Sequence, residues 1–295
     1  MMMEVRGVTA GYGAKVVLRD INLMFRSGVN IVLGPNGAGK TTLFRVCSGA
    51  LRPYKGDVLI DGRNVHSDVE LKRLIGYLPH RDGLISELTV RDNLIFYANI
   101  YNIGERLDAR ILELARIFDV ENLLDTRVAQ LSHGQRRRVA LVRTLLHDPK
   151  VLLLDEPSNG LDPLAAKNLR KFVKKLVRAR DVVVVYSTHN LYEALELADR
   201  VAIISYGRIV FQGSLEELKR FLGGIKVGLR VRGNPLPVLS SLGYQAARDG
   251  NMWVVEVKSE DEIGRIVEEL TRNNIVVLEV KEIGNPLEEI LERVR

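Results

Sequence analysis

The chain has 295 residues, a length that allows one large domain or two domains of ordinary size. Hydrophobic residues make up 46% and charged residues 27%, which excludes a wholly disordered chain. The net charge of +6 fits nucleic acid, nucleotide phosphates or an anionic membrane surface without choosing among them, and the single cysteine, Cys47, excludes an intramolecular disulfide framework.

Strand-like and helix-like segments alternate over the first 223 residues. The predicted strands are short and apolar: Val16–Phe25, Val29–Leu33, Val151–Leu154, Val182–Ser187 and Val201–Ser205. A helix is predicted over Thr41–Ser48, and a hairpin over Lys55–Arg63 with Asp61 and Gly62 as its turn. Between about Thr89 and Leu131 the periodicity is helical, with no strand candidate. This order predicts an α/β domain with a largely parallel sheet and a helical insertion.

Gly223 and Gly224 mark a change of pattern, so we place a first domain at residues 1–223 and a second at 224–295. Beyond them, the segments KVGLRVRG, NMWVVEVKS and NIVVLEVKEI alternate with helical segments around Pro237–Leu242 and Asp261–Thr271. The pattern predicts a small α+β domain of about 70 residues. We expect it to end in a helix at Pro286–Val294.

The chain shows no membrane-spanning or targeting pattern. No apolar run approaches the roughly 18–20 residues that a spanning helix needs. Glu4 and Arg6 occupy positions where a signal peptide would need its apolar segment. We therefore expect a cytoplasmic protein that reaches a membrane only through a partner.

A glycine-rich segment between a predicted strand and a predicted helix matches the phosphate-binding pattern GxxxxGK[ST]. Its glycines let backbone N–H groups turn toward phosphates, and the helix dipole adds positive potential. In such a loop Lys40 bridges the β- and γ-phosphates, and the Thr41 hydroxyl ligates Mg²⁺. The predicted nucleotide-binding residues of the loop are Gly34, Pro35, Asn36, Gly37, Ala38, Gly39, Lys40, Thr41 and Thr42.

Two adjacent acids, Asp155 and Glu156, follow the apolar strand Val151–Leu154. A strand that ends in a carboxylate can place it beside the Mg²⁺ held by Thr41, so Asp155 is the predicted metal residue. Glu156 points elsewhere and is free to orient and polarise an attacking water. Adjacent acids are also common at a solvated strand end, but together with the phosphate loop they favour a nucleotide site.

The segment LSHGQ, residues 131–135, resembles the LSGGQ signature of the ATP-binding-cassette (ABC) ATPases. Other family motifs occur in the expected order: Tyr12 matches the aromatic residue that stacks on adenine, SNGLD (158–162) the loop after the catalytic glutamate, Ser187-Thr188-His189 the switch histidine, and ELTVRDNL (87–94) the start of the helical subdomain. The resemblance covers about residues 3–223. It implies a P-loop NTPase cassette with a mostly parallel sheet, an antiparallel β portion and a helical subdomain at about residues 81–145.

The resemblance also implies a mechanism that uses ATP and Mg²⁺. In relatives, two cassettes dock head-to-tail around two ATPs. The signature residues Ser132, His133, Gly134 and Gln135 would then act in trans, with Ser132 and the Gly134 amide facing the γ-phosphate held by the other subunit. His189 would contact the γ-phosphate and hold Glu156 and water in line, and Asp162 would carry the state of one site to the other. Hydrolysis would open the dimer.

Two residues depart from the family pattern. His80 stands where the family usually has a glutamine that reaches Mg²⁺ and the attacking water. A neutral imidazole can offer a nitrogen to metal or water and a protonated one cannot, so ATPase activity is expected to fall as the pH drops through about 6–7. The alternative is that His80 fills its loop without touching the nucleotide. His133 replaces the first signature glycine, which is tolerable if its side chain points away from the phosphate.

The favoured function is the energy-coupling subunit of a membrane transporter, which hydrolyses ATP and requires a separate polytopic membrane subunit. The cassette would dimerise with itself or with a related chain, on the inner face of the cell membrane. The C-terminal NPLEEILERV resembles the extension of ABC-2-type exporter subunits, whereas import subunits often carry a β-barrel-like extension. Export through an ABC-2-like permease is therefore favoured.

Two other classes of function fit the sequence less well. A soluble ABC ATPase acting on ribosomes or nucleic acid lacks support, because the chain has neither a long heptad run nor a second cassette. The basic runs Arg136–Arg138 and Lys171–Lys175 are expected to be solvated helix faces without interleaved aromatic residues, so no direct nucleic-acid contact is expected. An unrelated P-loop enzyme such as a small-molecule kinase would leave the signature without a role.

Overall fold

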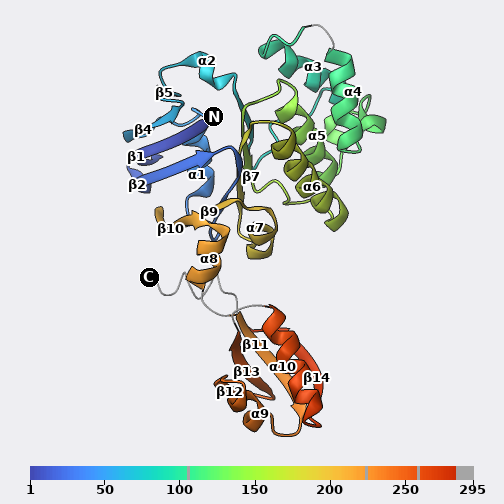
Figure 1. Cartoon of the computed structure of the whole chain (residues 1–295). Coiled ribbons are helices and arrows are strands. Elements are labelled where there is room, and N and C mark those ends of the chain that lie inside the picture. Colours follow the sequence, from blue (N-terminus) through green and yellow to red (C-terminus); the bar gives the residue numbers. More distant parts are fainter. Residues whose placement is uncertain (105–106, 223–224, 258–259, 284–295) are drawn as a thin grey trace. The chain divides into compact units, whose positions relative to one another are not determined.

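The computed structural model describes residues 1–104, 107–222, 225–257 and 260–283. The chain divides into two compact units, residues 1–215 and 216–295 (Figure 1). The boundary predicted at residues 223–224 lies beyond α8 (Leu215–Leu222), and those two residues lie outside the described ranges. Among the described residues, no helix is long and apolar enough to span a membrane.

The first unit contains a four-stranded antiparallel sheet. Its order is β2-β1-β4-β5, with β1 at Met2–Tyr12, β2 at Lys15–Arg26, β4 at Lys55–Ile60 and β5 at Arg63–Asn64. The predicted hairpin is confirmed, because Asp61 (φ 45°) and Gly62 (φ 82°) form the turn between β4 and β5. Strand β1 was not predicted, since Gly7 and Gly11 interrupt its alternation and its register shifts along the strand.

A six-stranded sheet holds the loops that matter for function. Its order is β10-β9-β3-β8-β7-β6, with β3 at Gly28–Leu33, β6 at Ile75–Leu78, β7 at Val151–Asp155, β8 at Val183–Thr188, β9 at Arg200–Ser205 and β10 at Arg208–Ser214. All pairs are parallel except β9 with β10. The carboxyl ends lie in register, because Leu33 pairs with Thr188 and Asp155 with Ser187. The loops after β3, β7 and β8 therefore meet at one edge, where open α/β sheets bind ligands.

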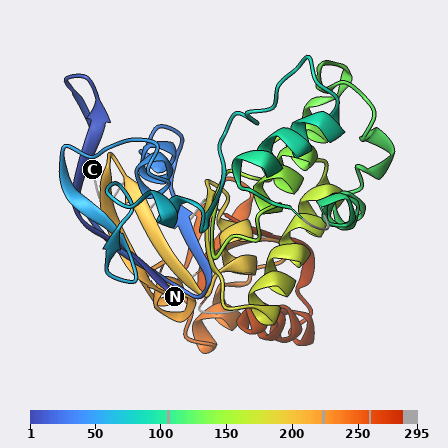
Figure 2. The same ribbon diagram turned by 90° about the horizontal axis from the view of Figure 1, so that it is seen from above.

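Helices surround this sheet, and three of them lie together apart from the antiparallel strands (Figure 1). The helices of the unit are α1 (Lys40–Cys47), α2 (Val69–Lys72), α3 (Val90–Ile100), α4 (Leu107–Ile117), α5 (His133–Leu145), α6 (Pro163–Ala179) and α7 (Leu191–Leu197), with short 3-10 turns at Glu121–Leu123 and Val128–Gln130. Figures 1 and 2 show α3, α4 and α5 gathered away from the blue antiparallel strands. The core combines both sheets with α1, since Phe25, Phe44 and Leu153 belong to one buried cluster.

The second unit contains a small α+β fold. Its elements are β11 (Ile225–Arg232), α9 (Leu236–Ser241), β12 (Ala246–Asp249), β13 (Met252–Val257), α10 (Glu260–Arg272) and β14 (Val276–Glu282), and its antiparallel sheet has the order β12-β13-β11-β14. Leu229, Leu239 and Leu270 join strands and helices in a single core. The sequence analysis missed β12, whose four residues carry no apolar alternation. The helix predicted at 286–294 lies outside the described residues.

Candidate nucleotide-binding site

The glycine-rich loop connects β3 to α1. Gly37 (φ 80°) and Gly39 (φ 112°) have left-handed backbone conformations, and a Cβ atom on Gly39 would lie 2.8 Å from Leu18 Cδ2. Glycine is needed at both places because other residues rarely adopt that conformation. In the described part of the chain no side chain caps the N-terminus of α1. The N–H groups of the first turn are therefore not used by a capping side chain, and the prediction that they bind a phosphate stays a prediction.

Lys40 lies folded over its own loop and contacts Glu156. Its Nζ atom donates to the carbonyl oxygens of Gly34 (2.7 Å) and Pro35 (3.0 Å), and it lies 3.0 Å from Glu156 Oε1. Burial by itself would raise the pKa of Glu156, but the hydrogen bond and charge of Lys40 outweigh it, so the pKa lies below its ordinary value. The predicted phosphate ligand and the predicted water-activating residue are therefore in contact with each other.

Asp155 ends β7 and is fully buried. Its Oδ1 accepts a hydrogen bond from Ser187 Oγ at 2.8 Å, whereas its Oδ2 has no partner among the described residues. A buried carboxylate oxygen without a partner is costly, and a hard divalent cation would satisfy it. Among the described residues, no group of three or more His, Cys, Asp and Glu side chains is arranged to hold a metal ion by itself. A buried carboxylate oxygen with no partner among the described residues is a donor that fits Mg²⁺, which takes water and phosphate oxygens as its other ligands.

Glu156 has a left-handed backbone conformation, which is unusual for a residue other than glycine. Its φ is 45°, a conformation that costs about 1–3 kcal/mol for a residue other than glycine. Its N–H donates to Ser187 Oγ at 2.9 Å, and its Oε2 accepts from Asn159 Nδ2. His189 Nδ1 lies 3.6 Å from the same oxygen, on a ring that is half exposed. The structure therefore brings the predicted residues Lys40, Glu156 and His189 together.

His80 lies in the loop after β6, next to the strand that carries Asp155. Its side chain is exposed and has no hydrogen-bond partner among the described residues, and its carbonyl oxygen accepts from Arg137. The structure thus brings the loop of His80 to the site. A contact of the imidazole with metal or water stays a prediction.

The signature segment forms the start of α5. Ser132 is the N-cap residue: its Oγ accepts from the Gln135 N–H at 3.3 Å, and its own N–H donates to Gln135 Oε1 at 2.8 Å. The His133 ring lies against Gly160, where an added Cβ atom would be 2.0 Å from His133 Cδ2. A Cβ atom on Gly134 would lie 2.9 Å from the Gly160 carbonyl oxygen. The signature and the loop 158–162 therefore pack against each other within one chain.

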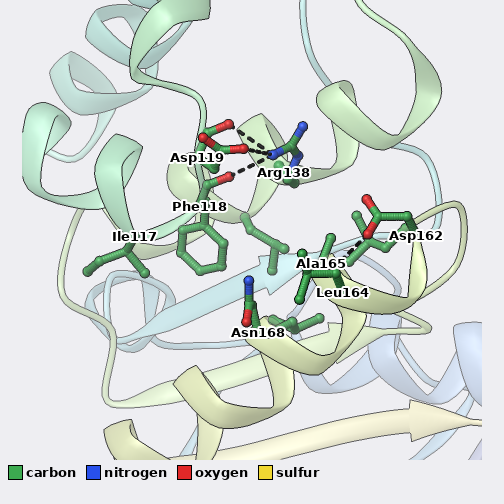
Figure 3. Close-up of a pocket in the computed structure, with 11 residues that line it drawn as sticks. Ile117, Phe118, Asp119, Arg138, Asp162, Leu164, Ala165 and Asn168 are labelled. Atoms are coloured by element: carbon green, nitrogen blue, oxygen red, sulfur yellow. Dashed lines mark hydrogen bonds and ion pairs between the residues drawn. The ribbon is translucent and has the colours of Figure 1, made fainter.

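Asp162 caps α6 and borders a small pocket. Its Oδ1 accepts from the Ala165 N–H at 2.9 Å, and its side chain is otherwise exposed. Figure 3 shows the pocket, of about 100 Å³, between this helix start and the ion pair of Arg138 with Asp119. The predicted role of Asp162 in communication between sites concerns a second subunit and stays a prediction.

Tyr12, predicted to stack on adenine, ends β1 and is 42% exposed. Its hydroxyl accepts a hydrogen bond from Arg45 at 2.9 Å, and the Arg45 guanidinium lies 5.7 Å from the ring centre. Arg45 belongs to α1, the helix that follows the phosphate loop. The exposed ring is thus tied to the helix that follows the predicted phosphate-binding loop.

Sequence reasoning missed two buried charged residues at this edge. Glu193, on α7, accepts from Tyr186, from Thr188 (2.7 Å) and from Ser158 (3.2 Å), and so joins the end of β8 to the loop after β7. Arg137 is 2% exposed, so the expectation that Arg136–Arg138 form a solvated face is wrong for it. Arg137 stands three and four residues before the apolar Ala140 and Leu141, which places all three on one helix face. This spacing was the signal in the sequence that Arg137 is buried.

Comparisons with known proteins identify the family of this chain. A family model described as ABC transporter matches residues 18–159. The chain is similar to the daunorubicin resistance ATP-binding protein DrrA3 of Streptomyces coeruleorubidus, at 39% identity over 78% of this chain and 73% of the relative. It is also similar to the sulfate/thiosulfate import ATP-binding protein CysA of Methylococcus capsulatus, at 35% identity over 74% of this chain but only 64% of that relative.

Among solved structures, the chain is similar to a dimeric ATP-binding cassette in a post-hydrolysis state bound to ADP and Pi. The TM-score is 0.67 at 25% identity, over 72% of this chain and 98% of that one. This chain therefore belongs to the ATP-binding subunits of ABC transporters, and its first unit is an ABC ATPase domain with the P-loop NTPase cassette fold. The predicted family and fold class are confirmed.

Proposed function

We propose that the chain hydrolyses ATP as one half of a cassette dimer and thereby drives a separate polytopic membrane subunit. The observation that carries the proposal is the meeting of the phosphate loop, Asp155 and Glu156 at the carboxyl edge of the parallel sheet. Both charged groups are placed as expected of a site for a charged ligand: Lys40 is held by the Glu156 carboxylate, and one buried oxygen of Asp155 has no hydrogen-bond partner among the described residues.

Within one subunit the residues have distinct tasks. The loop amides and Lys40 bind the phosphates, and Tyr12 stacks on the base. Asp155 and Thr41 would hold Mg²⁺, which when bound neutralises charge on the phosphate oxygens. When Lys40 turns to the phosphates, Glu156 loses its ion pair and is free to orient water, with His189 beside it. Asn159 keeps the Glu156 carboxylate in place.

The signature completes the site from a second subunit. Ser132 and the Gly134 amide lie at the start of α5, a helix end that suits an anion. Dimerisation is supported by the similarity to a cassette solved as a dimer with ADP and Pi. The partner subunit can be a second copy of this chain or a related one.

A mixing experiment tests the shared site. A Lys40→Ala subunit keeps a sound signature, and a Ser132→Arg subunit keeps a sound phosphate loop, so each alone is inactive but their mixture contains one complete site. We expect ATPase activity to reappear on mixing. Lys40→Ala mixed with Glu156→Gln is the matched control, because every site then has a damaged phosphate-loop half. Absence of recovery in the first mixture, with mixed dimers demonstrated, would rule out a site shared between subunits.

The membrane partner we propose is an ABC-2-like permease, and the direction is export. Support comes from the similarity to a drug-resistance ATP-binding protein, although import proteins are similar as well. The described part of the second unit is an open four-stranded sheet with two helices, which differs from the barrel-like extension expected of import subunits. The chain would then lie on the inner face of the cell membrane through its partner.

A further inference from the structure

Arg137, on α5, makes hydrogen bonds to two loops at once. Its Nη1 donates to the carbonyl oxygens of Pro79 (2.6 Å) and His80 (3.3 Å), in the loop after β6. Its Nη2 donates to those of Asp155 (2.6 Å) and Glu156 (2.9 Å), at the end of β7. Its Nε donates to Pro157 at 3.4 Å. Each nitrogen of the guanidinium is thus used, and each acceptor is a backbone carbonyl.

Burying the Arg137 guanidinium with only backbone carbonyls as partners costs free energy of folding. A buried cation is usually paired with a carboxylate, and Arg137 has no ion pair among the described residues. Burial lowers its pKa to about 10, which leaves it charged at neutral pH. A planar fork of five donors matches several fixed acceptors better than an ammonium does. The geometry therefore suits the fixing of backbone positions.

Two neighbouring arginines on α5 provide a contrast. Arg143 is also buried and donates to the carbonyl oxygens of Tyr77 (3.3 Å), Asp82 (2.8 Å) and Gly83 (3.2 Å). Arg136 pairs with the Asp82 carboxylate at 2.8 Å. Both hold the loop after β6 and neither contacts the loop after β7. Only Arg137 among these three joins the two loops.

We propose that Arg137 is a positioning residue for ATP hydrolysis, which sets the loop of His80 and the loop of Asp155 and Glu156 at a fixed separation. The inference rests on the ATPase activity of the first unit and not on the transported substrate. Ser132 caps α5, and Arg137 lies in the second turn of the same helix. The hydrogen bonds of Arg137 therefore also join the signature to the loop of Asp155 and Glu156 in its own chain. Arg137 acts through the backbone and touches no reacting atom.

The test compares Arg137→Gln with the matched variant Arg143→Gln, and with Arg137→Lys. Turnover, affinity for a fluorescent ATP analogue and backbone hydrogen exchange are measured at a temperature where all three variants are folded. We expect Arg137→Gln to lower kcat by about 10–100-fold with less than about a threefold change in nucleotide affinity, because a small misplacement of reacting groups is expensive. Arg137→Lys should recover part of kcat.

Hydrogen exchange separates positioning from general loosening without relying on activity. Arg137→Gln should speed exchange in both loops, around residues 77–84 and 155–161, whereas Arg143→Gln should speed it only in the first. Equal loss of kcat in both variants, or faster exchange confined to the loop after β6 in Arg137→Gln, would overturn the proposal. Should Arg137→Gln not fold, the same comparison is made with Arg137→Lys. An unchanged kcat together with unchanged exchange in both loops of Arg137→Lys would then overturn the proposal.

Discussion

Lys40 and Glu156 form an ion pair, with 3.0 Å between Nζ and Oε1. Both side chains are almost buried, at 5% and 12% exposed, so the pair is shielded from solvent. The γ-phosphate that Lys40 is proposed to bind must therefore replace Glu156 as its partner. Binding of ATP and release of the catalytic carboxylate would then be one event.

Lys40→Ala should weaken nucleotide binding strongly, since the loop loses its only lysine and Glu156 is left as an uncompensated negative charge facing the phosphates. We expect the affinity for ATP to fall by at least about tenfold. Titration calorimetry with ATP measures it, and Lys15→Ala, an exposed lysine on β2, is the control. Binding of unchanged strength in Lys40→Ala would contradict the placement of the phosphates.

Glu156→Gln should remove water activation while it preserves binding. Turnover is expected to drop by about 10²–10⁴-fold, the usual contribution of a general base. Because glutamine is neutral and holds Lys40 less strongly, ATP affinity should stay the same or rise. The variant should therefore accumulate as an ATP-bound dimer, which sedimentation with and without ATP detects. A monomer that turns ATP over at the normal rate would refute the catalytic role of Glu156.

The lowered pKa of Glu156 predicts a pH dependence of stability without nucleotide. A carboxyl group whose pKa is lower in the folded chain than its ordinary 4.5 stabilises the fold above that pH, and the contribution is lost as the pH falls through the folded value. Denaturant titrations of wild type and Glu156→Gln should therefore differ most above about pH 5. The difference should shrink under more acidic conditions. A constant difference over the whole range would argue against the ion pair in solution.

Gly160→Ala should destabilise the first unit for two separable reasons. Gly160 has φ 78°, and an added Cβ atom would lie 2.0 Å from His133 Cδ2. We expect a loss of about 1–3 kcal/mol in unfolding free energy. The double variant His133→Gly with Gly160→Ala should recover the steric part and leave about 1 kcal/mol of backbone strain. Additive effects in a double-mutant cycle would show that the two residues do not contact each other.

Much of the fold followed from the sequence because its signals were local. Strands such as Val29–Leu33 are continuous apolar runs, and the phosphate loop is defined by glycines next to a lysine. Strand β12 and strand β1 were missed because their pairing depends on distant partners and their alternation is weak.

The candidate site was predicted in its residues but not in its contacts. No spacing rule predicts that Lys40 contacts Glu156 or that His133 lies on Gly160, since these contacts join segments far apart in the chain. Arg137 was misjudged for the same reason: in sequence it stands in a basic run, and only the tertiary fold places backbone carbonyls of two loops around it.

The most direct test of the account is capture of the membrane partner. Tagged Glu156→Gln protein is incubated with ATP and detergent-solubilised membranes from its own source, purified by the tag, and its companions are identified by mass spectrometry, with Lys40→Ala as the control. The account predicts a polytopic membrane protein that is enriched with Glu156→Gln and ATP. Recovery of ribosomes or nucleic acid without any membrane protein would contradict it and support a soluble cassette instead.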